Sequence, residues 1–242
     1  MKDFCVQLGS REVPNAFVAR FLNHLKASSA PRLREESTRW KSSPLRELGL
    51  SFVARVGLLA SIRKEVSKCW STLDAELRVR RDELRRSGAE GLAFQLDDRA
   101  LYRDLLVGVD AFLFEYRAAI ELLETFLLRV VHDVFDRKMD RTTLRSELIE
   151  TGVDAGWVSQ LSHFRDMVAH EVTLSLAVHV VSEEPWQWEL VLQKGHPLDG
   201  GVPLEDVPWR VIQGAEDGLR SALQIIERWL FAQVEHYEDR QL

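Results

Sequence analysis

The sequence predicts a mainly α protein, an up-and-down helical bundle with a β-hairpin inserted before its last helix. Three segments carry apolar residues at spacings of three and four, which is the pattern of a helix with one buried face. Between the second and third of them, at about residues 172–194, apolar residues alternate with a period of two, which is typical of a strand. Residues 46–242 are expected to form this bundle, and residues 1–45 an N-terminal helical extension and linker.

Composition favours a folded protein and sets limits on its partners. Hydrophobic residues make up 45% and charged residues 29% of the 242-residue chain, so disorder is not expected. The net charge of −6 means that any contact with nucleic acid would need a local basic patch. The two cysteines, Cys5 and Cys69, indicate a reducing compartment rather than a disulfide framework. With no signal-peptide pattern at Met1–Ser10 and no apolar run of about 20 residues, we expect a cytoplasmic protein without a membrane span.

The extension is expected to hold one helix and a linker. A helix is predicted over Pro14–Lys26, where apolar residues recur at helical spacing. The polar stretch Ser28–Pro44, which contains two prolines, is interpreted as a loop or linker.

Two long helices should follow as an antiparallel hairpin. The first is predicted from Ser51, and it loses its apolar pattern in the run RVRRDELRRSG, with Gly88 and Gly91 as stop signals. Its stripe is Phe52, Val56, Leu59, Ile62, Val66, Cys69, Leu73 and Leu77. Asp97 or Asp98 can cap the second. Its stripe is Leu101, Leu105, Phe112, Tyr116, Ile120, Leu123, Leu127, Val130 and Val134.

The rest of the chain is predicted to hold shorter elements and a final helix. Short helices are expected near Thr142–Glu150 and from Asp154, and the two strands should be joined by a turn at Ser182–Pro185. Asp206 is expected to cap the last helix, with Pro208 in its first turn.

The candidate catalytic site is the segment LSHFRDMVAHE, which contains Arg165, Asp166 and His170. On a helix, Asp166 and His170 are four residues apart and share a face, so the carboxylate could orient the imidazole or raise its pKa. Arg165 lies about 140° around the helix from His170, and only its long side chain or a helix end would bring both groups onto one phosphate. Such a set suits phosphodiester chemistry, with a guanidinium on the phosphate and an imidazole moving a proton. The Arg-to-His spacing alone is not specific.

In its helical setting, the run FRDMVAHE resembles the HEPN domain family, whose motif is an arginine, four to six residues and a histidine. The residue after the arginine in that family is commonly Asn, Asp or His, and here it is Asp166. The resemblance covers Ser51 to the C-terminus, with the hairpin as a departure from the simplest members. It implies a metal-independent endoribonuclease without a cofactor, acting as a homodimer whose two motifs form one RNA-cleaving cleft. Arg165 would clamp the phosphate, His170 would transfer protons, and Asp166 would position its neighbours, leaving a 2′,3′-cyclic phosphate.

The resemblance also implies partners. Many family members are toxins of toxin–antitoxin systems or phage-defence effectors, often paired with an antitoxin or a nucleotidyltransferase-like protein. Some members have lost activity, so a non-catalytic HEPN-like module that binds RNA or protein is the alternative. A third reading is a helical scaffold in which His170 caps a helix beside an unrelated arginine. The basic run Arg78–Arg86 could bind an RNA backbone, although it is more typical of a solvated helix end.

Overall fold

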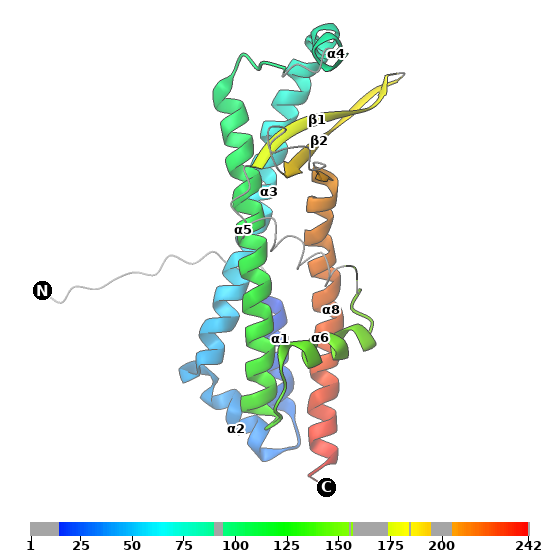
Figure 1. The fold of residues 1–242 in the computed structure, drawn as a ribbon. Helices are drawn as coiled ribbons and strands as arrows, with labels where there is room; N and C mark the ends of the chain where they lie inside the picture. The colour runs from blue at the N-terminus through cyan, green and yellow to red at the C-terminus, as the bar shows by residue number, and fades with distance from the viewer. Residues whose placement is uncertain are drawn as a thin grey trace, which may run out of the picture.

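The computed structural model describes residues 15–89, 94–154, 156, 174–183, 185–194 and 205–241. It is mainly helical, with a small three-stranded antiparallel sheet before the C-terminal helix. Helices α3 (Pro44–Val79), α5 (Arg99–Arg129) and α8 (Trp209–Asp239) run along the length of the molecule (Figure 1). The sheet lies toward one end of them and α2 (Pro31–Arg39) at the other. The predicted helical bundle is therefore confirmed at this level. Within the described ranges, no helix has both the length and the apolar character needed to cross a membrane.

The N-terminal segment is more helical than its composition predicted. Helix α1 (Asn15–Ala27) is followed by α2 (Pro31–Arg39) and the 3-10 turn η1 (Trp40–Ser42). The linker expected over Ser28–Pro44 was therefore wrong. Pro31 begins α2, where its missing N–H leaves no hydrogen bond unmade, and Leu33 and Trp40 are buried. Together with the buried Ala30, these two side chains anchor a segment that is otherwise polar.

The first long helix also starts earlier than predicted. Helix α3 (Pro44–Val79) begins at Pro44 rather than Ser51, and the hydroxyl of Ser43 caps it by accepting a hydrogen bond from the amide of Leu45 at 3.2 Å. Beyond its end, the basic run forms a separate helix α4 (Arg81–Ala89), so Gly88 lies inside a helix instead of ending one.

The second long helix matches its prediction closely. Asp98 caps α5 (Arg99–Arg129) by accepting hydrogen bonds from two backbone amides, at 2.9 and 3.1 Å. All nine residues predicted for its apolar stripe are buried, the last two in the π-helical turn η2 (Val130–Val134). Helices α3 and α5 pack closely against each other. A Cβ atom placed on Gly108 would lie 2.7 Å from Cγ2 of Val66, so any larger residue at this crossing would displace the Val66 side chain.

The N-terminal helices share the core of the long hairpin. The Phe17 ring of α1 lies edge-on to Phe52 of α3 and to Phe126 of α5, with centroids 6.4 and 6.3 Å apart. Two turns further along α1, His24 stacks on Phe231 of the C-terminal helix at 4.2 Å. These ring contacts fix α1 between α3, α5 and the C-terminal helix.

The sheet has one strand more than the predicted hairpin. Strands β1 (Leu174–Glu183) and β2 (Trp186–Lys194) pair antiparallel as expected, and β3 (Glu205–Pro208) pairs with the end of β2. The predicted helix cap at Asp206, with Pro208 in the first turn, was therefore wrong. Both residues lie in β3, and helix α8 (Trp209–Asp239) begins after them. The pairing partner of β3 is distant in sequence, and a local Asp-Pro signal does not reveal it.

Candidate functional site

The predicted site residues Arg165, Asp166 and His170 lie outside the described residues. Their distances from one another and their roles therefore stay predictions. The helix expected from Asp154 falls in the same part of the chain, which follows α6 and precedes β1. The described elements on either side of this segment are α6 before it and the sheet after it.

Before the segment, helix α6 (Arg141–Glu150) is held firmly against the bundle. Asp140 caps it by accepting a hydrogen bond from the amide of Thr143 at 2.8 Å, and this bond lowers the pKa of the Asp140 carboxyl. Leu144 and Leu148 are buried beneath it. Arg145 donates from Nε to the buried Glu124 of α5 at 2.6 Å. The cap, the apolar face and this ion pair together fix where the chain leaves α6.

After the segment, the sheet is tied to α3 through a tryptophan. The indole Nε1 of Trp188 in β2 donates a hydrogen bond to Oδ1 of Asp74 at 2.7 Å. Arg78 donates to the other oxygen of Asp74 at 2.8 Å, and its guanidinium lies 5.2 Å from the centre of the indole ring. The hydrogen bond from Arg78 has the larger effect on the pKa of Asp74 and the bond from Trp188 a smaller one, and both hold this pKa below its usual value.

A buried glutamate binds two arginines between α3 and α8. Glu216 of α8 is 1% exposed, yet it carries a carboxylate. Arg220, one turn further along α8, donates from Nη2 to its Oε1 at 2.7 Å. Arg63 of α3 places Nε 3.1 Å from Oε2, which is ion-pair distance, but the direction is poor and Oε2 accepts no hydrogen bond within the described part of the chain. We name Arg63, Glu216 and Arg220 the Glu216 cluster.

Polar groups continue from this cluster along the same two helices. Nε2 of Gln213 lies 3.5 Å from the hydroxyl oxygen of Ser67, so an amide and a hydroxyl face each other across α3 and α8. On the α5 side, the buried hydroxyl of Tyr116 donates to the carbonyl of Ala215 at 3.0 Å. Glu216 was not among the site residues predicted from the sequence. The available signal was a carboxylate beside the apolar stripe of α8, with an arginine four residues on.

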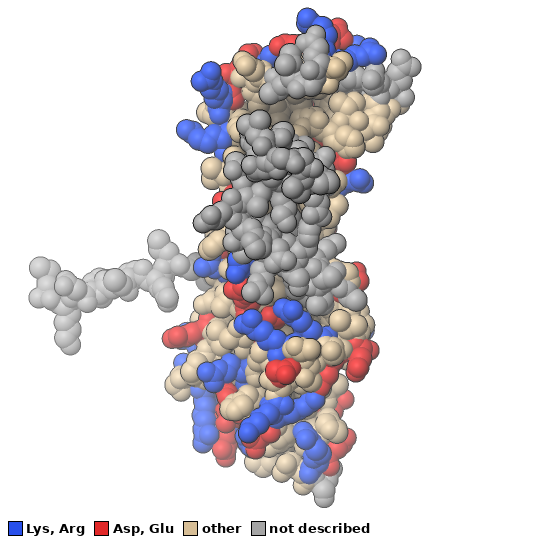
Figure 2. All heavy atoms as spheres, in the orientation of Figure 1, with Lys and Arg blue, Asp and Glu red and all other residues tan. Residues whose placement is uncertain are grey.

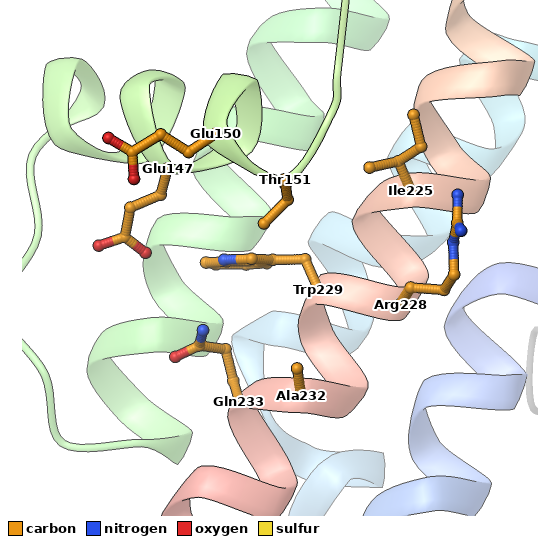
Figure 3. A pocket seen from close by; sticks show the side chains of 8 residues that line it. All are labelled: Glu147, Glu150, Thr151, Ile225, Arg228, Trp229, Ala232 and Gln233. Carbon is orange, nitrogen blue, oxygen red and sulfur yellow. The ribbon is translucent and has the colours of Figure 1, made fainter.

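A pocket of about 510 Å³ opens between the end of α6 and α8 (Figure 3). The residues that line it are Glu147, Glu150, Thr151, Ile225, Arg228, Trp229, Ala232 and Gln233. The Trp229 side chain extends from α8 toward α6 across the pocket, but only 4% of this residue is exposed. Glu147 pairs with Arg137, which also lies 3.5 Å from Gln233. With two carboxylates on the α6 side, the pocket does not favour a phosphate.

The basic run Arg78–Arg86 is largely engaged in ion pairs with acidic neighbours, and Figure 2 shows basic and acidic residues intermixed at this end of the molecule. Arg80 contacts Glu76 and Glu83, each at 2.9 Å, and Asp97 at 3.3 Å. Its guanidinium also lies 4.5 Å from the centre of the Phe94 ring. These contacts join α3, α4 and the start of α5. They support the interpretation of the run as a solvated helix end with a structural role.

Comparison of the chain with family models, with curated proteins and with solved structures finds no match. The likeness to the HEPN family therefore rests on the residues of the motif and on their helical setting.

Proposed function

We propose that this chain is a metal-independent endoribonuclease of HEPN type that cleaves RNA in a cleft formed by two copies. The observation that carries the proposal is the sequence from Arg165 to His170, RDMVAH, which places a permanent cation and a group that titrates near neutral pH five residues apart. The helical bundle on either side of the motif supports it, because the long α3–α5 hairpin precedes the motif and α8 follows it.

The chemistry follows from the two side chains. His170 transfers a proton as the ribose 2′-oxygen attacks the phosphorus and the bond from phosphorus to the 5′-oxygen breaks. The 2′-hydroxyl gives up one proton and the leaving 5′-oxygen gains one, so the products are a 2′,3′-cyclic phosphate and a 5′-hydroxyl. Arg165 binds the non-bridging oxygens, where negative charge grows in the transition state. Asp166 positions its neighbours.

The test is cleavage of mixed-sequence RNA in EDTA by the wild type, by an Arg165→Ala, His170→Ala double variant and by His163→Ala. His163 is the matched control, since it removes an imidazole from the same segment outside the motif. We expect cleavage by the wild type and by the control, and none by the double variant. Equal cleavage by all three, or no cleavage of diverse RNAs by any, contradicts the enzyme. Binding of RNA without cleavage would instead favour a non-catalytic HEPN-like module.

The shared cleft predicts a homodimer. Light scattering over a range of protein concentrations measures the mass directly, and the chain itself is 27.8 kDa. A dimer that persists at the concentrations used for cleavage agrees with the mechanism. A strict monomer that still cleaves RNA contradicts the shared cleft. A role as a toxin or phage-defence effector, with an antitoxin or nucleotidyltransferase-like partner, is part of the same proposal and predicts that expression of the active chain alone slows growth.

A further inference from the structure

We infer that the Glu216 cluster is a binding site for a backbone phosphate of RNA, with Arg63 and Arg220 as the binding groups and Glu216 as the residue that positions them. The inference rests on the proposed function for the identity of the ligand. Its physical basis is independent of the motif, because all three residues lie in the described part of α3 and α8.

Burial of Glu216 calls for an explanation beyond stability. A carboxylate that is 1% exposed has lost nearly all its water, and this desolvation offsets much of the attraction to its two arginines. Buried ion pairs are often no more stabilising than apolar side chains of similar volume. An apolar residue at this position would extend the stripe that already contains Ile212 and Leu219. The carboxylate instead holds the Arg220 guanidinium by a hydrogen bond and keeps that of Arg63 at ion-pair distance.

The two guanidiniums keep donors for a further ligand. Arg220 uses Nη2 and Arg63 places Nε on the carboxylate, whereas each group carries five N–H donors. Their side chains remain 57% and 33% exposed. Two positive charges around one negative charge leave the cluster with a net charge of about +1. Within the described residues, Glu216 is the one carboxylate at ion-pair distance from either arginine.

The ion pair between Arg20 and Glu227 differs from the Glu216 cluster in the number of guanidiniums that the carboxylate contacts. Arg20 of α1 places both Nε and Nη2 on the two oxygens of Glu227 in α8, so one guanidinium meets one carboxylate edge to edge. That pair is complete and neutral. In the Glu216 cluster, two guanidiniums share one carboxylate, and the amide of Gln213 and hydroxyl of Ser67 lie nearby on the same helices. Two oriented guanidiniums with neutral donors beside them match the oxygens of a phosphate.

Binding of a single-stranded RNA oligonucleotide, followed by fluorescence anisotropy at several salt concentrations, tests the inference. All proteins carry Arg165→Ala and His170→Ala, so that the RNA stays intact. The comparison adds Arg63→Ala with Arg220→Ala. The control adds Arg20→Ala with Arg39→Ala, which removes the same charge from two exposed arginines already paired with carboxylates. Thermal unfolding of each protein shows that it is folded.

Each phosphate contact contributes about 0.7 to the slope of log K against log salt for a single strand. Because the cluster binds one backbone phosphate and carries a net charge of about +1, we expect the Arg63, Arg220 variant to lower that slope by about 0.7 and to bind roughly tenfold more weakly at moderate salt. The control should keep the parent slope. Lysines at positions 63 and 220 should restore most of the slope, since they keep the charge. If the double alanine variant does not fold, Arg220→Ala alone should also lower the slope, by no more than about 0.7.

The outcomes separate this inference from the proposed function. An unchanged slope in the Arg63, Arg220 variant overturns the phosphate site, even where the wild type cleaves RNA. A reduced slope supports the site, even where the wild type does not cleave, in which case the endoribonuclease proposal fails alone. Binding of inorganic phosphate to the same proteins is measured as a further comparison. If the Arg63, Arg220 variant loses phosphate binding but keeps the RNA affinity of the parent, the cluster binds a small anion and the assignment to RNA is overturned.

Discussion

Trp188 and Asp74 join the sheet to the bundle through one hydrogen bond, from the indole Nε1 to Oδ1 at 2.7 Å. Strand β2 therefore contacts α3 at Trp188, which lies opposite Val180 of β1 and precedes the stretch Val191–Lys194 that pairs with β3. Replacing Trp188 with phenylalanine keeps an aromatic ring and removes the donor. We expect a loss of about 1 kcal/mol in the free energy of unfolding, measured by urea denaturation. Unchanged stability in Trp188→Phe would mean that this hydrogen bond does not hold the sheet.

Asp74 gives the same contact a pH dependence. Its pKa is lowered first by the hydrogen bond from Arg78 and then by the bond from Trp188. A carboxyl whose folded pKa lies below its unfolded value stabilises the fold above the unfolded value, which is about 3.9 for Asp, and this stabilisation is lost as the pH falls through the folded pKa. The difference in stability between the wild type and Asp74→Asn should therefore be largest near neutral pH and shrink below about pH 4. A difference that stays constant down to pH 2 contradicts this assignment.

Gly108 is the tightest point between α3 and α5. A methyl group at this position would lie 2.7 Å from Cγ2 of Val66, so Gly108→Ala should destabilise the protein by about 1–3 kcal/mol. Gly214 of α8 is the matched control, because a Cβ there meets nothing within 4 Å. Gly214→Ala should raise stability by about 0.5–1 kcal/mol. Adding Val66→Ala should recover part of the Gly108→Ala loss, and a simple sum of the two single effects would argue against the clash.

Asp140 is the cap that fixes the start of α6. Asp140→Ala removes the acceptor for the amide of Thr143 and should lower the free energy of unfolding by about 1 kcal/mol. Asp140→Asn keeps an acceptor and should retain most of the stability. Equal losses in the two variants would show that the charge rather than the hydrogen bond is responsible.

The elements that could be predicted are those whose signal is local and repeated. The nine residues of the α5 stripe from Leu101 to Val134 are all buried, because a helix with one long apolar face turns that face toward the core. Helix α2 was missed because only one of its residues, Leu33, is buried, with Ala30 and Trp40 buried just outside its two ends. Strand β3 was missed because four residues carry little periodicity and their partner is elsewhere in the chain.

The candidate site residues also divide into those with a local sequence signal and those that only the packing of helices brings together. Arg165, Asp166 and His170 were found from a contiguous motif, and their arrangement remains a prediction. The Glu216 cluster joins Arg63 to residues far along the chain, and only the packing of α3 against α8 brings them together. Its visible half was the pair Glu216 and Arg220, four residues apart on one helix. A single such pair is common on helix surfaces, so it could not be distinguished without the burial of Glu216.

The mass of the fragments released from a defined RNA oligonucleotide in EDTA tests the proposed cleavage reaction. We expect fragments that end in a 2′,3′-cyclic phosphate and others that begin with a 5′-hydroxyl, with none released by the Arg165→Ala, His170→Ala variant. Fragments with a 3′-hydroxyl and a 5′-phosphate, or cleavage that persists in that variant, would contradict it.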